Sequence, residues 1–337
     1  MKPNLGKVLV TGGAGYCGSE LVPMLLEKGY SVKVYDIGYF GVGHLPIQNQ
    51  NLEIVLGDIR DTKSFFKAVV GCDYVINLAC ISNDASFELD ESLSTSINLQ
   101  AFEPMVLAAK KAKIRRFIYA SSSSVYGISS ELNVTEEHPL VPLTLYNKYK
   151  GLCEPLLLKH TDSDFVGTIF RPATVCGVSM RQRFDLSVNI LTNHAVNDGI
   201  IKVFGGTQLR PNLHIRDYCK AVIKLLNAED SLIANQIFNV GFQNLTINQI
   251  SIMVKEIVEN EFPALGKIHI KVEDSNDNRS YHINSEKIQR VLGFIPEYTV
   301  ANAVKDLCDG FKANKFPNSM TDINFFNVKK LMAISAK

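Results

Sequence analysis

The sequence predicts an α/β protein built on a doubly wound parallel sheet, with a smaller, interleaved C-terminal α/β domain. Short apolar runs alternate with helical stretches through the first half, and a glycine-rich turn joins the first run to the first helix. Parallel strands need long crossover connections, which the intervening helices provide. A chain of 337 residues is also long for one simple domain.

The strands expected in the first half are apolar runs at residues 7–10, 32–36, 53–56, 74–79, 117–120 and 165–170. The run at 74–79 is apolar almost throughout, which is typical of a strand buried on both faces. Helices are expected at residues 19–28, 63–70, 92–112 and 152–159, and Gly29 is placed to end the first of them.

The second half is less regular. Helices are expected near residues 186–195, 217–226 and 247–260, with strands at 200–204, 236–240 and 267–273 and a polar turn at 274–279. No internal repeat or low-complexity linker separates the halves, so we expect two interleaved domains. Residues 1–173 with about 212–242 form the first expected domain, which contains the glycine-rich turn, and about 174–211 with 243–330 form the second, smaller one.

The turn at residues 11–18, TGGAGYCG, carries glycines at positions 12, 15 and 18 between the first strand and the first helix. A strand, a glycine-rich turn and a helix form the unit that binds a dinucleotide. A pyrophosphate must approach the main chain closely, which a Cβ would obstruct, and it then lies at the positive end of the helix. This turn therefore predicts a dinucleotide site that includes Gly12 and Gly15.

Asp36 ends the second expected strand and lies 18 residues after Gly18. This is close to the spacing of a carboxylate that accepts hydrogen bonds from the adenosine ribose. A carboxylate there would repel a 2′-phosphate, and no arginine directly follows Asp36. The sequence therefore favours NAD over NADP.

Composition excludes several other classes of protein. The formal net charge is +1, so no polyanion-binding surface or nucleic-acid partner is expected. The seven cysteines form no CxxC pair or Cys/His cluster, which indicates free thiols in a reducing compartment and no metal site. The chain enters its first strand within seven residues, leaving no room for a signal peptide, and no apolar run is long enough to span a membrane. We therefore expect a cytoplasmic protein with no membrane partner.

Two motifs indicate redox chemistry on a hydroxyl group. A serine run at residues 121–124 follows an expected strand, at the sheet edge where open parallel sheets bind ligands. Tyr146 and Lys150 lie four residues apart, which is one helical turn. A nearby ammonium group and a positive nicotinamide ring both favour the phenolate of tyrosine. Tyr146 could then take a hydroxyl proton while hydride leaves for NAD⁺, with a serine hydroxyl on the same oxygen.

Taken together, these motifs resemble the extended short-chain dehydrogenases/reductases of the nucleotide-sugar epimerase/dehydratase group. The resemblance runs from about residue 7 to residue 309. Its elements are TGGAGYCG at 11–18, GDIRD at 57–61, NLAC at 77–80, SSSSVYG at 121–127, YNKYK at 146–150 and RPATVCG at 171–177. It implies a Rossmann-type fold, NAD as cofactor and a nucleotide-diphosphate sugar as substrate.

The resemblance also implies roles for particular residues. Tyr146 is the implied catalytic base, Lys150 binds the nicotinamide ribose and lowers the tyrosine pKa, and Ser122, four residues before Tyr126, assists proton transfer. The implied cofactor-binding residues are Gly12, Gly15, Tyr16, Cys17, Asp36, Asp58, Ile59, Leu78, Ala79, Tyr146 and Lys150. The implied substrate-binding residues are Ser123, Asn189, Arg210 and Arg279, of which the two arginines would hold the diphosphate.

One departure from the family pattern concerns the type of reaction. The 4,6-dehydratases of the group carry an Asp-Glu pair where this chain has Ser123 and Ser124, and serines cannot act as that acid/base couple. The sequence therefore predicts an NAD-dependent nucleotide-sugar epimerase that works through a transient 4-keto intermediate. The same residues would also serve a nucleotide-sugar 4-dehydrogenase or an NAD(P)-dependent 4-keto-reductase.

Two more distant alternatives are a dehydrogenase of a hydrophobic alcohol, which the two diphosphate-type arginines disfavour, and a non-catalytic NAD-binding protein, which the intact Ser122, Tyr146 and Lys150 disfavour. The resemblance further implies a homodimer that pairs two helices per subunit, here those at 92–112 and 145–159.

Overall fold

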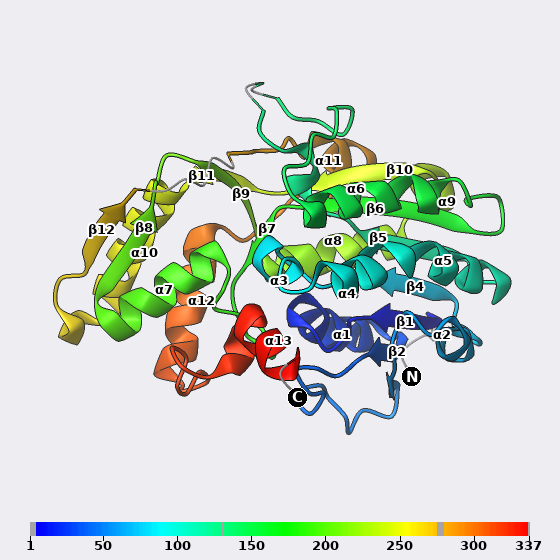
Figure 1. Cartoon of the computed structure of the whole chain (residues 1–337), viewed down its shortest axis with the longest axis horizontal. Coiled ribbons are helices and arrows are strands. Elements are labelled where there is room, and N and C mark those ends of the chain that lie inside the picture. Colours follow the sequence, from blue (N-terminus) through cyan, green and yellow to red (C-terminus); the bar gives the residue numbers. More distant parts are fainter. Residues whose placement is uncertain (1–4, 130, 132, 275–279, 336–337) are drawn as a thin grey trace.

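The computed structural model describes residues 5–129, 131, 133–274 and 280–335. A seven-stranded, fully parallel sheet forms its larger part (Figure 1). The spatial order of its strands is β10-β6-β5-β4-β1-β2-β3. Their bounds are Lys7–Thr11 (β1), Ser31–Asp36 (β2), Leu52–Leu56 (β3), Tyr74–Asn77 (β4), Arg116–Ala120 (β5), Val166–Pro172 (β6) and Gln236–Val240 (β10). The predicted doubly wound sheet is confirmed.

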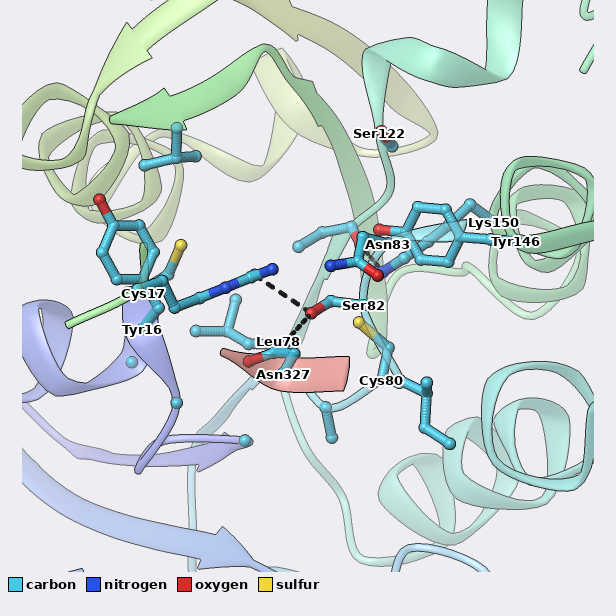
Figure 2. A pocket seen from close by; sticks show the side chains of 18 of the residues that line it. Tyr16, Cys17, Leu78, Cys80, Ser82, Asn83, Ser122, Tyr146, Lys150 and Asn327 are labelled. Atoms are coloured by element: carbon cyan, nitrogen blue, oxygen red, sulfur yellow. Dashed lines mark hydrogen bonds between the residues drawn. The ribbon is translucent and has the colours of Figure 1, made fainter. Parts of the chain in front are cut away.

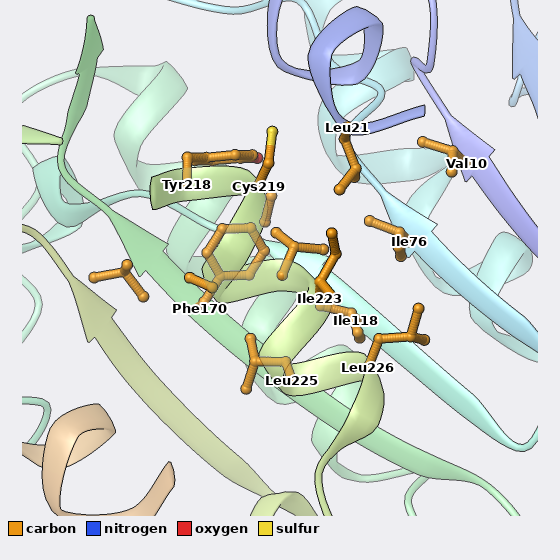
Figure 3. Packing of buried hydrophobic residues seen from close by; sticks show 14 of the residues in the cluster. Val10, Leu21, Ile76, Ile118, Phe170, Tyr218, Cys219, Ile223, Leu225 and Leu226 are labelled. Carbon is orange, nitrogen blue, oxygen red and sulfur yellow. The ribbon is translucent and has the colours of Figure 1, made fainter. Parts of the chain in front are cut away.

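Helices cover both faces of this sheet. One hydrophobic cluster joins it to α1 (Tyr16–Lys28), α8 (Ile215–Asn227) and α11 (Glu286–Leu292) (Figure 3). A second cluster joins the other face to α2 (Thr62–Val69), α5 (Phe102–Lys111) and α6 (Leu145–Leu158). Strands buried between two helical layers need apolar side chains on both faces, which explains the continuous apolar runs in the sequence.

The helix expected at residues 92–112 is interrupted. The chain forms α4 (Glu91–Thr95), a π-helical turn η1 (Ser96–Gln100) and then α5. Within this turn the Asn98 side chain accepts from the Ile81 amide and donates to the Ile81 carbonyl, both at 2.9 Å. These two bonds connect the wider turn to the segment that follows β4. Hydrophobic spacing alone did not predict the wider turn.

A smaller region contains two further sheets (Figure 1). Strands β7 (Thr174–Cys176), β9 (Leu209–His214) and β11 (Gln243–Thr246) form one of them, and β8 (Ile200–Phe204) pairs with β12 (His269–Glu273) in the other. Helices α7 (Ser187–Asp198), α10 (Ile247–Glu261) and α12 (Val300–Lys312) pack with them around a third hydrophobic cluster. The three strands of the β11-β9-β7 sheet were not expected from the sequence.

The remaining elements are short: α3 (Asp84–Phe87), α9 (Asp230–Ile233), α13 (Asn327–Ser335), and the 3-10 turns η2 (Ser123–Tyr126), η3 (Pro263–Leu265) and η4 (Ile323–Phe325). The C-terminal helix α13 returns to the larger region and contacts α3 (Figure 1). All seven cysteines are free thiols. In the part of the chain that the structure describes, no helix has the length and apolar character needed to cross a membrane.

Candidate active site

A cleft of about 400 Å³ lies at the carboxyl ends of the parallel strands (Figure 2). This is the edge where open α/β sheets bind their ligands. It brings together most of the residues that the sequence nominated. The nominated residues that line it are Gly12, Gly15, Tyr16, Cys17, Asp36, Asp58, Ile59, Leu78, Ala79, Ser122, Ser123, Tyr146 and Lys150.

The glycine-rich turn has the shape that a dinucleotide needs. Gly12 has φ +69°, and a Cβ there would lie 2.8 Å from the Ala79 nitrogen. A Cβ on Gly18 would lie 2.6 Å from the Gly12 carbonyl oxygen, so helix α1 could not approach the turn. Gly15 is the N-cap residue of α1 and supplies no side-chain cap for the first amides of the helix, and the first residues of α1, Tyr16 and Cys17, line the cleft. These features fit a bound pyrophosphate.

Asp36 is held in place by two backbone amides. Its carboxylate accepts from the Ala14 amide at 3.0 Å and from the Gly38 amide at 2.8 Å. The first bond ties the end of β2 to the glycine-rich turn, so the carboxylate has a fixed position at the cleft. The residues present therefore fit an adenosine ribose beside the pyrophosphate.

Asp58 and Ile59 lie at the same end of the cleft, just after β3. The Asp58 carboxylate pairs with Arg60, whose Nε lies 2.9 Å from Oδ2. Burial raises the pKa of Asp58, but the hydrogen bonds and charge of Arg60 outweigh it and lower the pKa below its usual value. This carboxylate therefore stays ionised at neutral pH.

The serine run forms the tight turn η2 above the cleft. The Ser122 and Ser124 hydroxyls are 2.7 Å apart, and the Ser124 hydroxyl donates to the side-chain carbonyl of Asn147. Because Ser124 donates to Asn147, the Ser122 hydroxyl is the donor to Ser124 in this arrangement. Ser122 thus belongs to a hydroxyl chain that reaches the residue next to Tyr146.

Tyr146 and Lys150 lie one turn apart on α6 (Figure 2). Burial raises the pKa of Tyr146 well above its ordinary value, the charges of Cys80 and Asp84 raise it further, and Arg183 opposes them. The Lys150 ammonium donates to the Ala120 carbonyl at 2.7 Å and is 5% exposed. A buried cation therefore lies one helical turn from the Tyr146 position.

A buried ion pair connects the serine turn, helix α6 and strand β6. Arg171 of β6 and Glu154 of α6 form two parallel hydrogen bonds, at 2.9 and 2.6 Å. Ser121 donates to the same carboxylate at 2.6 Å, and Arg171 donates to the Tyr126 hydroxyl at 2.6 Å. The pair therefore holds the serine turn and helix α6 at a fixed separation.

Two nominated substrate residues, Asn189 and Arg210, do not line the cleft. Asn189 is fully buried and uses its amide on the Gly177 backbone, the Arg183 carbonyl and the Tyr16 hydroxyl. Arg210 lies on β9 with its guanidinium 5.5 Å from the ring centre of Tyr281. Neither is among the residues that line the cleft, whereas Tyr281 is. Arg279 lies outside the described residues.

The cleft also contains residues that sequence reasoning did not assign to it. Among them are Ser82, Asn83, Asp84, Asn147, Arg181, Arg183, Tyr281, Asn327 and Leu331. The Arg-x-Arg pattern after the RPATVCG motif was a usable signal for two of them. Asn327 and Leu331 carry no signal, because they reach the cleft only through the return of the C-terminal helix.

The comparison with known proteins agrees with this geometry. The model of the NAD dependent epimerase/dehydratase family matches residues 8–241, more than half of the chain. The chain belongs to this family. It is therefore an NAD-dependent enzyme of the short-chain dehydrogenase/reductase type, and NAD is the dinucleotide that fits the cleft.

Relatives of this chain in the family are named as enzymes of different reactions. The chain is 27% identical to a UDP-glucose 4-epimerase of Lactobacillus helveticus, with 87% of this chain and 92% of the relative covered. It is 26% identical to a dTDP-glucose 4,6-dehydratase of Streptomyces niveus, with 92% and 94% covered. The structure of a UDP-glucuronic acid 4-epimerase from Bacillus cereus, solved with UDP-glucuronic acid and NAD, matches with a TM-score of 0.78 at 25% identity, covering 91% and 99%.

Proposed function

We propose that this enzyme is a nucleotide-sugar 4-epimerase. The observation that carries the proposal is one cleft that holds Tyr146, Lys150 and Ser122 together, with serines where the dehydratases of the group have an acid pair. Bound NAD would accept a hydride from the sugar and return it to the opposite face of the ring. The protein residues would move the hydroxyl proton and hold the sugar while it turns.

Tyr146 is the proposed base that takes the proton from the C4 hydroxyl and gives it back after inversion. Lys150, one turn along α6, would stabilise the phenolate and bind the nicotinamide ribose. Ser122 would bond the same sugar oxygen after its hydroxyl turns away from Ser124. Ser123, which is 1% exposed and lines the cleft, is the proposed neighbour of the sugar ring.

Serines favour epimerisation over dehydration. Removal of water needs one acid and one base beside C5 and C6, and Ser123 and Ser124 are neutral hydroxyls. Asp84 also lines the cleft, but its carboxylate accepts from Thr144, the N-cap residue of α6, at 2.6 Å. That bond gives Asp84 a structural role at the start of the catalytic helix.

The part of the substrate that the enzyme is proposed to bind most directly is the diphosphate of a sugar nucleotide. Arg210, which stacks on the cleft residue Tyr281, is the proposed anchor for it, with Arg279 and Asn189 as further nominated partners. We propose that residues 1–173 with about 212–242 bind the cofactor and that the remaining region binds the sugar nucleotide. A homodimer through α5 and α6 is supported by exposed Leu107 and Leu152, at 46% and 43% exposure.

Replacing Asp36 by Ala should weaken NAD binding by about tenfold to hundredfold, since a hydrogen bond to a charged group contributes about 1.5–3 kcal/mol. The discrimination against NADP should shrink as well, because the repulsion of a 2′-phosphate is removed. Isothermal titration with both cofactors measures the two effects. Asp309→Ala, at an exposed carboxylate on α12, is the matched control. An unchanged NAD affinity in Asp36→Ala would show that the ribose lies elsewhere.

The reaction itself is tested by incubating the purified enzyme with UDP-, GDP-, dTDP- and CDP-sugars, with and without added NAD⁺. We expect one of them to give a product of unchanged mass and inverted sugar configuration, with no accumulation of NADH. Product mass, NMR of the sugar and absorbance at the NADH band follow the outcome. A product that has lost water would contradict the assignment of Ser123 and Ser124, and stoichiometric NADH would make the enzyme a dehydrogenase.

A further inference from the structure

Two arginines in the loop between β7 and α7 lie inside the cleft. Arg181 and Arg183 line it and are only 6% and 7% exposed. Among the described residues, Nη2 of Arg183 and Nε of Arg181 have no hydrogen-bond partner. A buried guanidinium nitrogen without a partner is costly, so an acceptor that enters the cleft would be bound there favourably.

The positive charges of Arg181 and Arg183 also favour the binding of an anion. One carboxylate oxygen of Asp185 accepts from Nε of Arg183 at 2.8 Å, and the other accepts from the backbone amide of Asn327 at 2.9 Å. Of the two buried guanidinium groups, Arg183 thus bonds a carboxylate directly, whereas the hydrogen bond of Nη2 of Arg181 goes to Asn327. Burial and the neighbouring Arg183 lower the pKa of Arg181 to about 9, as expected for like charges held close together.

The place of the two arginines indicates which anion. Arg183 donates to the Ser82 hydroxyl at 3.2 Å, and its charge acts both on Cys17 in the glycine-rich turn and on Tyr146. Arg181 lies over the ring of Phe40, four residues after Asp36, with 3.5 Å between the guanidinium carbon and the ring centre. The pair thus lies between the ribose carboxylate at one end of the cleft and the catalytic tyrosine at the other.

The C-terminal helix holds this pair in place. The side-chain carbonyl of Asn327 accepts from Nη2 of Arg181 at 2.6 Å. The side-chain nitrogen of Asn327 donates to the Ser82 hydroxyl at 2.9 Å (Figure 2). The Ser82 hydroxyl oxygen therefore accepts hydrogen bonds from both Arg183 and Asn327. Asn327 is 6% exposed, and Leu331 of the same helix also lines the cleft.

We infer that Arg183, together with Arg181, binds the pyrophosphate of the bound dinucleotide, and that Asn327 positions both arginines. The main-chain amides at the start of α1 approach the pyrophosphate from one side, and the guanidinium groups approach it from the substrate region. The C-terminal helix is then part of the cofactor site. This inference concerns the cofactor and does not depend on which sugar the enzyme takes.

Binding of NAD, ADP and adenosine, and of the free diphosphates UDP, GDP and dTDP, to the nucleotide-free full chain tests the inference by isothermal titration. Arg183→Gln should weaken NAD and ADP by about tenfold to hundredfold and leave adenosine unchanged, since adenosine has no phosphate. Arg183→Lys should recover part of the loss. The matched control is Arg115→Gln, which removes an arginine paired with Asp230 outside the cleft.

Asn327→Ala, at a residue that only positions the arginines, should give a smaller loss with the same selectivity for NAD and ADP over adenosine. If Arg183→Gln does not fold, this variant decides the question. Equal losses for adenosine would show a general disturbance of the fold and overturn the inference. A loss confined to UDP, GDP or dTDP, with NAD unchanged, would also overturn it by assigning the arginines to the substrate diphosphate.

Discussion

The Tyr146→Phe enzyme should bind NAD normally and lose turnover by roughly 10²–10⁴-fold, the contribution of a general acid–base group. The ring of phenylalanine fills the same buried position on α6, so the fold and the cofactor site should be kept. What is lost is the hydroxyl that exchanges a proton with the sugar. Steady-state kinetics on the substrate found by the panel, with NAD titration in parallel, measure the two properties separately. Turnover within tenfold of the unmodified enzyme would remove Tyr146 from the mechanism.

The pH profile gives an independent test of the same residue. A base acts in its deprotonated form, and burial raises the pKa of Tyr146, so kcat/KM should rise with pH through the neutral range. Lys150→Met removes the cation one turn away and should move this rising limb to higher pH. A limb that stays in place would show that Lys150 does not act on the tyrosine.

Glu154→Ala should destabilise the folded protein by about 3–5 kcal/mol, because it leaves the Arg171 guanidinium buried without its partner. The side chains of Glu154 and Arg171 are only 3% and 4% exposed, so water cannot replace the lost carboxylate. The serine turn should loosen as well, since Ser121 and Tyr126 are fixed by the same pair. Urea unfolding at neutral pH, followed by circular dichroism, measures the free energy of unfolding.

The matched control is Glu297→Ala at the surface pair with Lys220, where the glutamate is 64% exposed. That change should cost less than about 1 kcal/mol, because exposed ion pairs contribute little. Combining Glu154→Ala with Arg171→Met should recover part of the stability, since no buried charge is then left alone. A loss below about 1 kcal/mol for Glu154→Ala alone would contradict the role given to the pair.

The parts of the fold that were predictable are those with local signals. Continuous apolar runs predicted the strands of the large sheet, and Gly29, with φ +104°, ends α1 as expected. The glycine-rich turn, Asp36 and the Tyr146–Lys150 spacing were readable because each needs a particular residue at a particular separation. Their common position at one sheet edge follows from the direction of parallel strands.

What could not be predicted depends on contacts between distant segments. Strand β9 carries Arg210, Pro211 and Asn212, a polar stretch with no strand pattern, and it becomes a strand by pairing with β7 and β11. The helix expected at 92–112 widens because Asn98 bonds the backbone of Ile81. Asn327 reaches Arg181 across 146 residues of chain, so no local pattern could place it at the cofactor.

The central claim is that hydride leaves C4 of a sugar nucleotide and returns to the same carbon. Its most direct test uses the substrate found by the panel, labelled with deuterium at C4, and locates the label in the product by NMR. We expect the deuterium to remain at C4 of the inverted sugar, with none released to solvent. Deuterium found instead on free NADH, together with an accumulating keto-sugar, would contradict epimerisation and assign the enzyme to net oxidation.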